Sequence, residues 1–238
     1  MDATQDISIS HLDWDSDFFN MKICRIDGMR FDVIPEETFR RLKAEGYKLA
    51  YVMIPYTNTV SLSDGVSTKP VDIKIVYSKL LTDRDKMADM PEIALCTKAS
   101  DRLYDLAYQA GHMSRFRMDP NFEDTAFKRM YRAWIDNSVA GIIADYVFGY
   151  YEGQMPIGLL TLRIKDGVAE IGLIAVDEAA RGKGLGRSLL QKACAMSYEK
   201  GATRITVATQ KINKGACAFY ESNGFSLDSS TAIYHKWM

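Results

Sequence analysis

The residues best suited to chemistry form a short glycine-rich run, R-G-K-G-L-G, at residues 181–186. Glycine at alternate positions lets a backbone approach a ligand without collisions of Cβ atoms. The run follows an apolar, strand-like segment at 171–176 and leads into an amphipathic helical segment at 185–200. The first turn of a helix leaves N–H groups unpaired and carries the positive end of the helix dipole. A strand, a glycine turn and a helix start together predict a binding site for phosphates.

The glycine spacing separates three kinds of phosphate loop. A P-loop requires G-x-x-x-x-G-K-[ST], and neither that spacing nor the Lys-Ser/Thr pair is present. A dinucleotide loop requires G-x-G-x-x-G and an acidic residue about 20 positions later, but the next strand ends in V-A-T-Q. The remaining pattern, [QR]-x-x-G-x-[GA], is met by Arg181, Gly184 and Gly186. It resembles the acyl-CoA pyrophosphate loop of the GNAT N-acetyltransferase superfamily, with an ordinary glycine-rich turn as the alternative.

This resemblance implies acetyl-CoA as the co-substrate. The strand at 171–176 would pair with the pantetheine arm, and an N–H near Ala175 or Val176 would polarise the thioester carbonyl. Asn213, on the next strand-to-helix turn, would bond the pantetheine arm or the phosphate. Its alternative role is a helix N-cap, and one residue can fill both. The pyrophosphate would bind the backbone amides of Arg181, Gly182, Lys183, Gly184, Leu185, Gly186 and Arg187.

Two further side chains have the chemistry of proton transfer. Tyr220, in A-F-Y-E-S-N-G-F, matches the position where many members of the superfamily place a tyrosine beside the CoA sulfur. A phenol with a pKa of about 10 can protonate a thiolate whose thiol pKa is about 8.5, and the alternative role is a core aromatic. Glu170, in V-A-E-I-G-L-I-A-V, resembles the strand position of the general base in the histone acetyltransferase branch. It would act through water, and the alternative is a solvated carboxylate.

Two segments narrow the resemblance further. The segments L-D-W-D-S-D-F-F-N at 12–20 and S-R-F-R-M-D at 114–119 resemble parts of the bacterial dTDP-fucosamine acetyltransferases. Those enzymes N-acetylate a 4-amino-4,6-dideoxy sugar on a dTDP carrier. Glu170 departs from their pattern, in which no carboxylate is expected there. Arg115 and Arg117, on either side of Phe116, would recognise the diphosphate of the acceptor, with solvated surface arginines as the alternative.

The composition excludes several other classes of protein. The 238 residues carry a net charge of −1 without a block of like charges, so we expect no nucleic-acid partner. The N-terminus is polar and acidic, unlike a signal peptide, and no apolar run approaches the roughly 18 residues of a membrane span. The four cysteines and three histidines are scattered, so we expect reduced thiols, a cytoplasmic location and no metal site. The oligomeric state stays open, a homodimer included.

The elements that must position the site residues alternate through residues 91–238. Strands are predicted at 92–98, 141–151, 157–165, 168–176, 203–210 and 225–237, and helices at 101–110, 123–138, 185–200 and 214–221. Ser100 predicts a helix cap, and Asp166-Gly167 predicts a tight hairpin. This order resembles the GNAT fold, an α/β (α+β) fold with a mixed central sheet.

Residues 1–85 are predicted to form a separate, small α/β domain. Its elements are strands at 22–29, 47–54 and 71–80 and a helix at 36–45, with a polar loop at 58–70 and a linker at 83–89.

Taken together, these patterns predict an acetyl-CoA-dependent N-acetyltransferase that acts on a nucleotide-linked amino sugar by direct transfer in a ternary complex. No Cys or Ser lies in a nucleophile motif, so we expect no acyl-enzyme. One alternative is a GNAT enzyme for another amine, such as a protein N-terminus, a polyamine or an antibiotic. The other is an acyl-CoA-binding module without turnover. The intact loop and Tyr220 favour catalysis.

Overall fold

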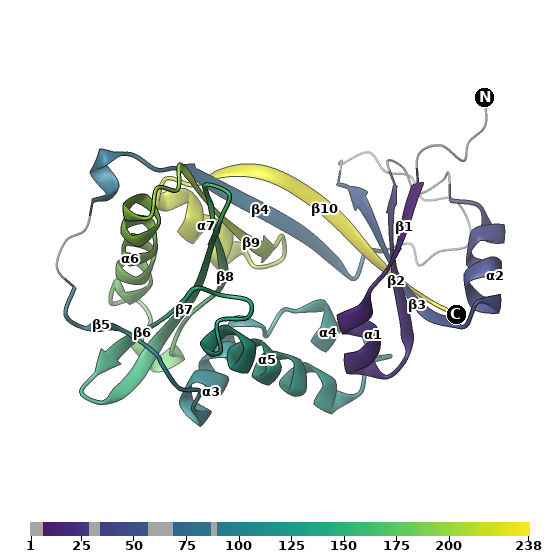
Figure 1. The fold of residues 1–238 in the computed structure, drawn as a ribbon, viewed down its shortest axis with the longest axis horizontal. Coiled ribbons are helices and arrows are strands. Elements are labelled where there is room, and N and C mark those ends of the chain that lie inside the picture. Colours follow the sequence, from purple (N-terminus) through teal and green to yellow (C-terminus); the bar gives the residue numbers. More distant parts are fainter. Residues whose placement is uncertain (1–6, 29–33, 57–68, 87–89) are drawn as a thin grey trace. The chain divides into compact units, whose positions relative to one another are not determined.

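The chain forms two compact units that interleave along the sequence. A computed structural model describes residues 7–28, 34–56, 69–86 and 90–238. The first unit comprises residues up to Ile75 together with Gln210–Ile212 and Ser229–Met238, and the second comprises Val76–Thr209 and Asn213–Asp228. Strands β4 (Asp72–Leu80) and β10 (Ser226–Trp237) therefore contribute residues to both units (Figure 1).

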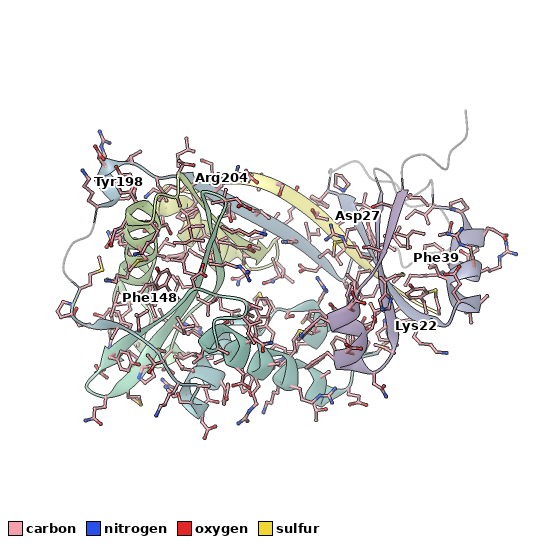
Figure 2. All side chains as sticks on the ribbon, viewed as in Figure 1. Lys22, Asp27, Phe39, Phe148, Tyr198 and Arg204 are labelled. Atoms are coloured by element: carbon pink, nitrogen blue, oxygen red, sulfur yellow. The ribbon has the colours of Figure 1, made fainter. Side chains whose placement is uncertain are left out.

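In the first unit the strands follow the order β1-β2-β3-β10. β2 and β3 run parallel, whereas β1 and β10 are antiparallel to their neighbours. Phe39 of α2 is buried, and the ammonium of Lys236 lies 5.1 Å from the centre of its ring (Figure 2). The elements before β4 are β1 (Ile7–His11), α1 (Asp13–Phe19), β2 (Lys22–Gly28), α2 (Glu36–Ala44) and β3 (Tyr47–Pro55).

In the second unit a mixed sheet has the strand order β4-β9-β8-β7-β6-β5. From β5 to β8 each strand is antiparallel to its neighbour, and β8 and β9 run parallel. This mixed sheet with helices confirms the predicted fold class. After β4 the elements are η2 (Asp83–Asp85), β5 (Ile93–Leu95), α3 (Asp101–Ala110), α4 (Arg115–Met118), α5 (Asp124–Val139), β6 (Tyr146–Glu152), β7 (Met155–Lys165), β8 (Val168–Val176), η3 (Glu178–Ala180), α6 (Leu185–Glu199), β9 (Arg204–Gln210), α7 (Lys214–Ser222) and β10.

Helices cover both faces of β6 to β8 in this unit (Figure 1). Helix α6 packs on one face, because its apolar residues recur at three- and four-residue spacing and include the fully buried Leu189 and Ala193. Phe148 of β6 is buried there, with the ammonium of Lys192 6.0 Å from the centre of its ring (Figure 2). Helices α3 and α5 pack on the other face and share one apolar cluster with Leu173 of β8.

Local signals place several elements correctly. Ser100 Oγ accepts the Leu103 N–H at 3.4 Å and so caps α3 as predicted. The hairpin between β7 and β8 turns at Asp166 and Gly167, whose φ angles are 51° and 76°. Both values lie in the left-handed region that a tight hairpin turn of this type requires. The predicted strand at 168–176 coincides with β8.

Other predicted boundaries are wrong. β6 begins at Tyr146 rather than at 141, because the chain first closes the end of α5, where the Ile142 N–H donates to Asn137 O at 2.9 Å. β5 is shorter than the predicted strand at 92–98, and β7 begins two residues earlier than predicted. The predicted linker begins with the short helix η2, which Thr82 caps. Residues 87–89 and most of the polar loop at 58–70 lie outside the described residues. α1, α4 and β1 are not predicted.

None of the helices in the described part of the chain is both long and apolar enough to cross a membrane.

Candidate active site

A β-bulge interrupts β8 where its pairing with β9 ends. β8 pairs with β7 along its whole length but with β9 only up to Ile171. The register with β7 shifts at Gly172, and the Leu173 N–H donates to Thr161 Oγ1 at 2.9 Å. A Cβ on Gly172 would lie 2.8 Å from that same oxygen, so the bulge requires glycine. A bulge bends its strand and ends pairing. Beyond Gly172 the backbone of β8 therefore pairs with no described strand on the side of β9.

The bulge also decides which N–H groups face this unpaired edge. The Asp177 N–H donates to Ile157 O at 2.8 Å, on the side of β7. Successive N–H groups of a strand point to opposite edges. The Ala175 N–H therefore faces β7, whereas those of Ile174 and Val176 face the unpaired edge. Of the two residues predicted to polarise a carbonyl, Val176 has the suitable orientation. Ile174 shares it and was missed, although an isolated glycine in a strand indicates a bulge.

The glycine run turns the chain from β8 into α6 and leaves backbone donors open. Gly182 and Gly184 have φ angles of 80° and 85°, in the region that glycine adopts without steric cost. A Cβ on either residue would meet no atom within 4 Å. Gly184 is the N-cap of α6 and supplies no side-chain cap, and Ser188 is the residue whose N–H reaches Gly184 O, at 3.2 Å. The N–H groups of residues 185–187 are therefore available to an anion.

The basic side chains of this run divide into two kinds. Lys183 and Arg187 are exposed, and neither forms an ion pair with the described residues. Arg181 instead bonds within the protein, because its Nε donates to Val176 O at 3.1 Å and its Nη2 donates to Gln109 Oε1 at 3.4 Å. Lys183 and Arg187 are thus the cations that a phosphate can bind, whereas the Arg181 side chain holds the loop to the end of β8.

The last turn of α3 fastens the segment between β8 and the glycine run. Gln109 Oε1 accepts the Glu178 N–H at 3.0 Å, and its Nε2 donates to Asp177 Oδ2 at 3.4 Å. Arg102 Nη2 donates to the same carboxylate oxygen at 2.5 Å. Hydrogen bonds from the Ala179 N–H and from Arg102 hold the pKa of Asp177 below its usual range. Sequence reasoning missed Gln109, because its partners lie far along the chain and no motif marks it.

Helix α7 places Phe219, the neighbour of Tyr220, against the start of α6. The ring of the neighbouring Phe219 lies 3.4 Å from the position that a Cβ would take on Gly186. Tyr220 is 4% exposed, and its ring centre lies 5.8 Å from that of Tyr77 and 6.0 Å from that of Phe225. Burial raises the pKa of Tyr220, so its hydroxyl stays protonated at neutral pH. This packing matches the core-aromatic alternative, and the raised pKa makes the phenol a weaker acid than a free tyrosine.

Two other predicted residues lie at the margins of this arrangement. Asn213 is the N-cap of α7, since its Oδ1 accepts the Ala216 N–H at 3.1 Å. Its Nδ2 has no acceptor among the described residues and can donate to a ligand. Glu170 is exposed on β8, opposite Arg163. It precedes Ile174 by four residues, about 13 Å along a strand, so its carboxylate reaches the unpaired edge only through water.

A pocket of about 380 Å³ lies among α3, α4 and α5. Arg117 lines the pocket and is exposed, whereas Arg115 does not line it. Arg115 is half-buried, with its guanidinium carbon 4.5 Å from the centre of the Phe116 ring. The structure therefore separates the two predicted arginines. The lining residues are Tyr108, Phe116, Arg117, Asp119, Pro120, Phe122, Glu123, Phe127 and Lys128.

Metal-ligating and nucleophilic groups do not gather near the loop. Among the described residues there is no group of three or more His, Cys, Asp or Glu side chains that could hold a metal ion. The cysteines are free, and burial raises the pKa of Cys24 and of Cys194 to about 11. Burial also raises the pKa of Cys96. These three thiols stay protonated at neutral pH and are therefore poor nucleophiles.

The segment that carries this site matches a known family. Residues 102–225, from α3 through α7, match the acetyltransferase (GNAT) family. The chain belongs to this family, which confirms the resemblance seen in the glycine run. GNAT proteins use acetyl-CoA, and the loop described above fits that molecule: it offers open backbone donors and two exposed cations at one helix start.

Two relatives have names that refer to carbohydrates. The dTDP-fucosamine acetyltransferase of Escherichia coli is 34% identical over 134 residues, which cover 54% of this chain and 55% of that protein. The spore coat polysaccharide biosynthesis protein SpsD of Bacillus subtilis is 26% identical over 138 residues, covering 58% of this chain and 47% of that protein. The matches thus span about half the length of these relatives.

Solved structures share the fold. A GCN5-related N-acetyltransferase from Sphaerobacter thermophilus superposes with a TM-score of 0.57 at 15% identity, over 97% of this chain and 76% of that chain. A GCN5-related N-acetyltransferase from Kribbella flavida superposes with a TM-score of 0.52 at 17% identity, over 90% of this chain and 80% of that chain. At such identities the likeness concerns the fold alone.

Proposed function

We propose that the second unit transfers an acetyl group from acetyl-CoA to the amine of a nucleotide-linked amino sugar, directly within a ternary complex. One observation carries this proposal: the unpaired edge of β8 and the uncapped first turn of α6 adjoin the same glycine run. The helix start supplies N–H donors, Lys183 and Arg187 for phosphates. The strand edge supplies N–H donors for an extended arm and its carbonyl.

The proposal assigns each protein group a role in the transfer. The N–H of Val176 or Ile174 donates to the thioester oxygen and stabilises the negative charge that develops there. The amine nitrogen attacks the carbonyl carbon, the C–S bond breaks, and the departing thiolate takes the proton of Tyr220. The proton that the amine loses passes to water, with Glu170 as a remote acceptor.

The chemistry of an amino sugar suits a site without a close base. Ring oxygens withdraw electrons, so a sugar amine is less basic than a lysine amine, whose pKa is about 10.4. A useful fraction of the sugar amine is therefore neutral near pH 7. The 34% identity with the dTDP-fucosamine acetyltransferase supports this class of acceptor. The exposed Arg117 at the pocket among α3, α4 and α5 supports an anionic acceptor.

A substrate comparison tests the proposal. CoA release is measured with acetyl-CoA and either a dTDP-4-amino-4,6-dideoxy sugar or the same amino sugar without dTDP. We expect the dTDP form to be the much better substrate. Arg117→Ala should raise its KM at least tenfold, since a lost charge-assisted hydrogen bond costs about 1.5–3 kcal/mol. Arg115→Ala should have a smaller effect, because Arg115 does not line the pocket.

Other outcomes would identify the alternatives. Equal use of the free and dTDP-linked sugars would reject the nucleotide-linked acceptor and favour a GNAT enzyme for another amine. Binding of acetyl-CoA without CoA release in the presence of any amine would instead favour a non-catalytic acyl-CoA-binding module.

A further inference from the structure

Aromatic rings dominate the pocket among α3, α4 and α5. Tyr108 and Phe127 form a tilted pair with ring centres 6.1 Å apart, and Phe116 and Phe122 form a second, edge-to-face pair at 5.4 Å. Phe122 and Phe127 are buried, whereas Tyr108 and Phe116 are half-buried. The last two rings therefore keep surface that a flat group entering the pocket can contact.

Two cations stand beside these rings. The guanidinium carbon of Arg117 lies 5.6 Å from the centre of the Phe127 ring, and the ammonium of Lys128 lies 5.9 Å from the centre of the Tyr108 ring. Both side chains are exposed, and neither forms an ion pair with any residue that the structure describes. Each cation thus retains charge that a ligand can neutralise.

This combination selects a class of ligand. Aromatic rings alone also accept organic cations, as in cages for quaternary ammonium groups. Asp119 and Glu123 also line the pocket, but the charged groups that lie beside the rings are the cations of Lys128 and Arg117. A ligand held against the rings therefore meets positive charge, which favours an anion over an organic cation. A ligand that satisfies both features has a flat ring system joined to phosphates, because bases stack on aromatic side chains and phosphates bind Arg and Lys.

The position of the pocket relates it to the transfer site. Tyr108 precedes Gln109, which fastens the segment after β8. Further along α5, Trp134 Nε1 lies 3.7 Å from the position that a Cβ would take on Gly172, at the bulge. Phe127 and Trp134 are seven residues apart in the same helix, about 10 Å along its axis. In a nucleotide-linked sugar, the sugar ring and the diphosphate separate the base from the amine.

We propose that this pocket binds the nucleoside diphosphate part of the acceptor, with the base against Tyr108 and Phe116 and the phosphates at Arg117 and Lys128. The inference rests on the proposed function for the identity of the acceptor. It assigns Lys128 and the two aromatic residues a binding role that neither the glycine loop nor the transfer chemistry requires.

Calorimetry on the full chain tests this binding with three probes: dTDP, thymidine and inorganic pyrophosphate. Lys128→Ala should weaken dTDP and pyrophosphate binding at least fivefold and leave thymidine binding unchanged. Phe116→Leu should weaken dTDP and thymidine binding at least fivefold and leave pyrophosphate binding unchanged. Arg129→Ala is the matched control, because it removes a positive charge from the next position of α5 without touching the pocket lining. It should change none of the three affinities.

Two results would overturn the inference: absence of dTDP binding to the wild-type protein, or dTDP affinity unchanged in Lys128→Ala. Lys128 is exposed, so its removal leaves the fold intact and the test remains valid even if Phe116→Leu unfolds. Acetylation of a dTDP-amino sugar with KM unchanged in Lys128→Ala would refute the pocket and leave the proposed function standing. dTDP binding that depends on Lys128, without acetylation of any dTDP-amino sugar, would refute the proposed function and leave the pocket assignment standing.

Discussion

Replacing Gly184 by valine is the sharpest perturbation of the proposed acetyl-CoA site. The residue has a φ of 85° and caps α6, and a Cβ there meets no protein atom within 4 Å. The added Cβ therefore collides with no described atom of the protein. It instead occupies space beside the N–H groups of residues 185–187, where a pyrophosphate must approach.

Two magnitudes follow from this geometry. Holding a β-branched residue in the left-handed region costs about 1–3 kcal/mol of folding stability. In a chain of this size each kcal/mol lowers Tm by about 2–4 °C. Loss of a single charge-assisted hydrogen bond costs about 1.5–3 kcal/mol of binding free energy. The affinity for acetyl-CoA should therefore fall at least tenfold, because about 1.4 kcal/mol corresponds to a factor of ten.

Gly201→Val provides the matched control for strain. Gly201 follows the other end of α6, has a φ of 81°, and likewise has no atom within 4 Å of an added Cβ. Both variants should lower Tm similarly in thermal unfolding. Only Gly184→Val should lose acetyl-CoA affinity in calorimetry. Wild-type affinity in a folded Gly184→Val protein would refute the assignment of this loop.

Four other outcomes follow from the site. Tyr220→Phe keeps the ring, so kcat should fall about 10²-fold with little change in Tm or in KM for acetyl-CoA, and an unchanged kcat would exclude Tyr220 as the proton donor. Glu170→Gln should lower kcat only slightly. A large loss of kcat in Glu170→Gln with an unchanged kcat in Tyr220→Phe would favour Glu170, acting through water, over Tyr220 as the residue that matters for proton transfer. Because burial raises the pKa of Tyr220, its acid form persists as pH rises, and the pH profile of kcat should show no basic limb from it below about pH 10. A basic limb below about pH 10 that is present in the wild-type protein and disappears in Tyr220→Phe would contradict this. Gln109→Leu should raise KM for acetyl-CoA about fivefold while kcat is retained, since it removes hydrogen bonds to the segment after β8; an equal loss in kcat would indicate another role.

Local rules predict the parts of this site that depend on neighbouring residues. The strand β8 and the hairpin before it follow from alternation and from Asp166-Gly167, a pair that tolerates positive φ. The glycine run and the Asn213 cap follow from short-range backbone chemistry in the same way. The position of the glycine turn before α6 and the helix-capping role of Asn213 therefore agree with their predicted positions, whereas phosphate binding there stays a prediction.

Long-range contacts determine the remainder, and the sequence does not display them. The alternation of buried and exposed residues continues across Gly172, so the bulge that reverses the direction of the Ile174 and Val176 N–H groups leaves no trace in hydrophobicity. The difference between Arg115 and Arg117 depends on how the four-residue helix α4 packs, and so short an element gives no periodic signal.

The partition of β10 between the two units bears on how the chain is synthesised. β3 needs residues 231–237 of β10 as its antiparallel partner. A ribosome adds about 5–20 residues per second, so roughly 10–35 s pass between the appearance of β3 and that of its partner. During this interval one edge of β3, beside the apolar Val52 and Ile54, has no strand to pair with. An unpaired edge is a template for association with other chains. The nascent protein is therefore more exposed to aggregation, and more in need of chaperone protection, until β10 has left the ribosome.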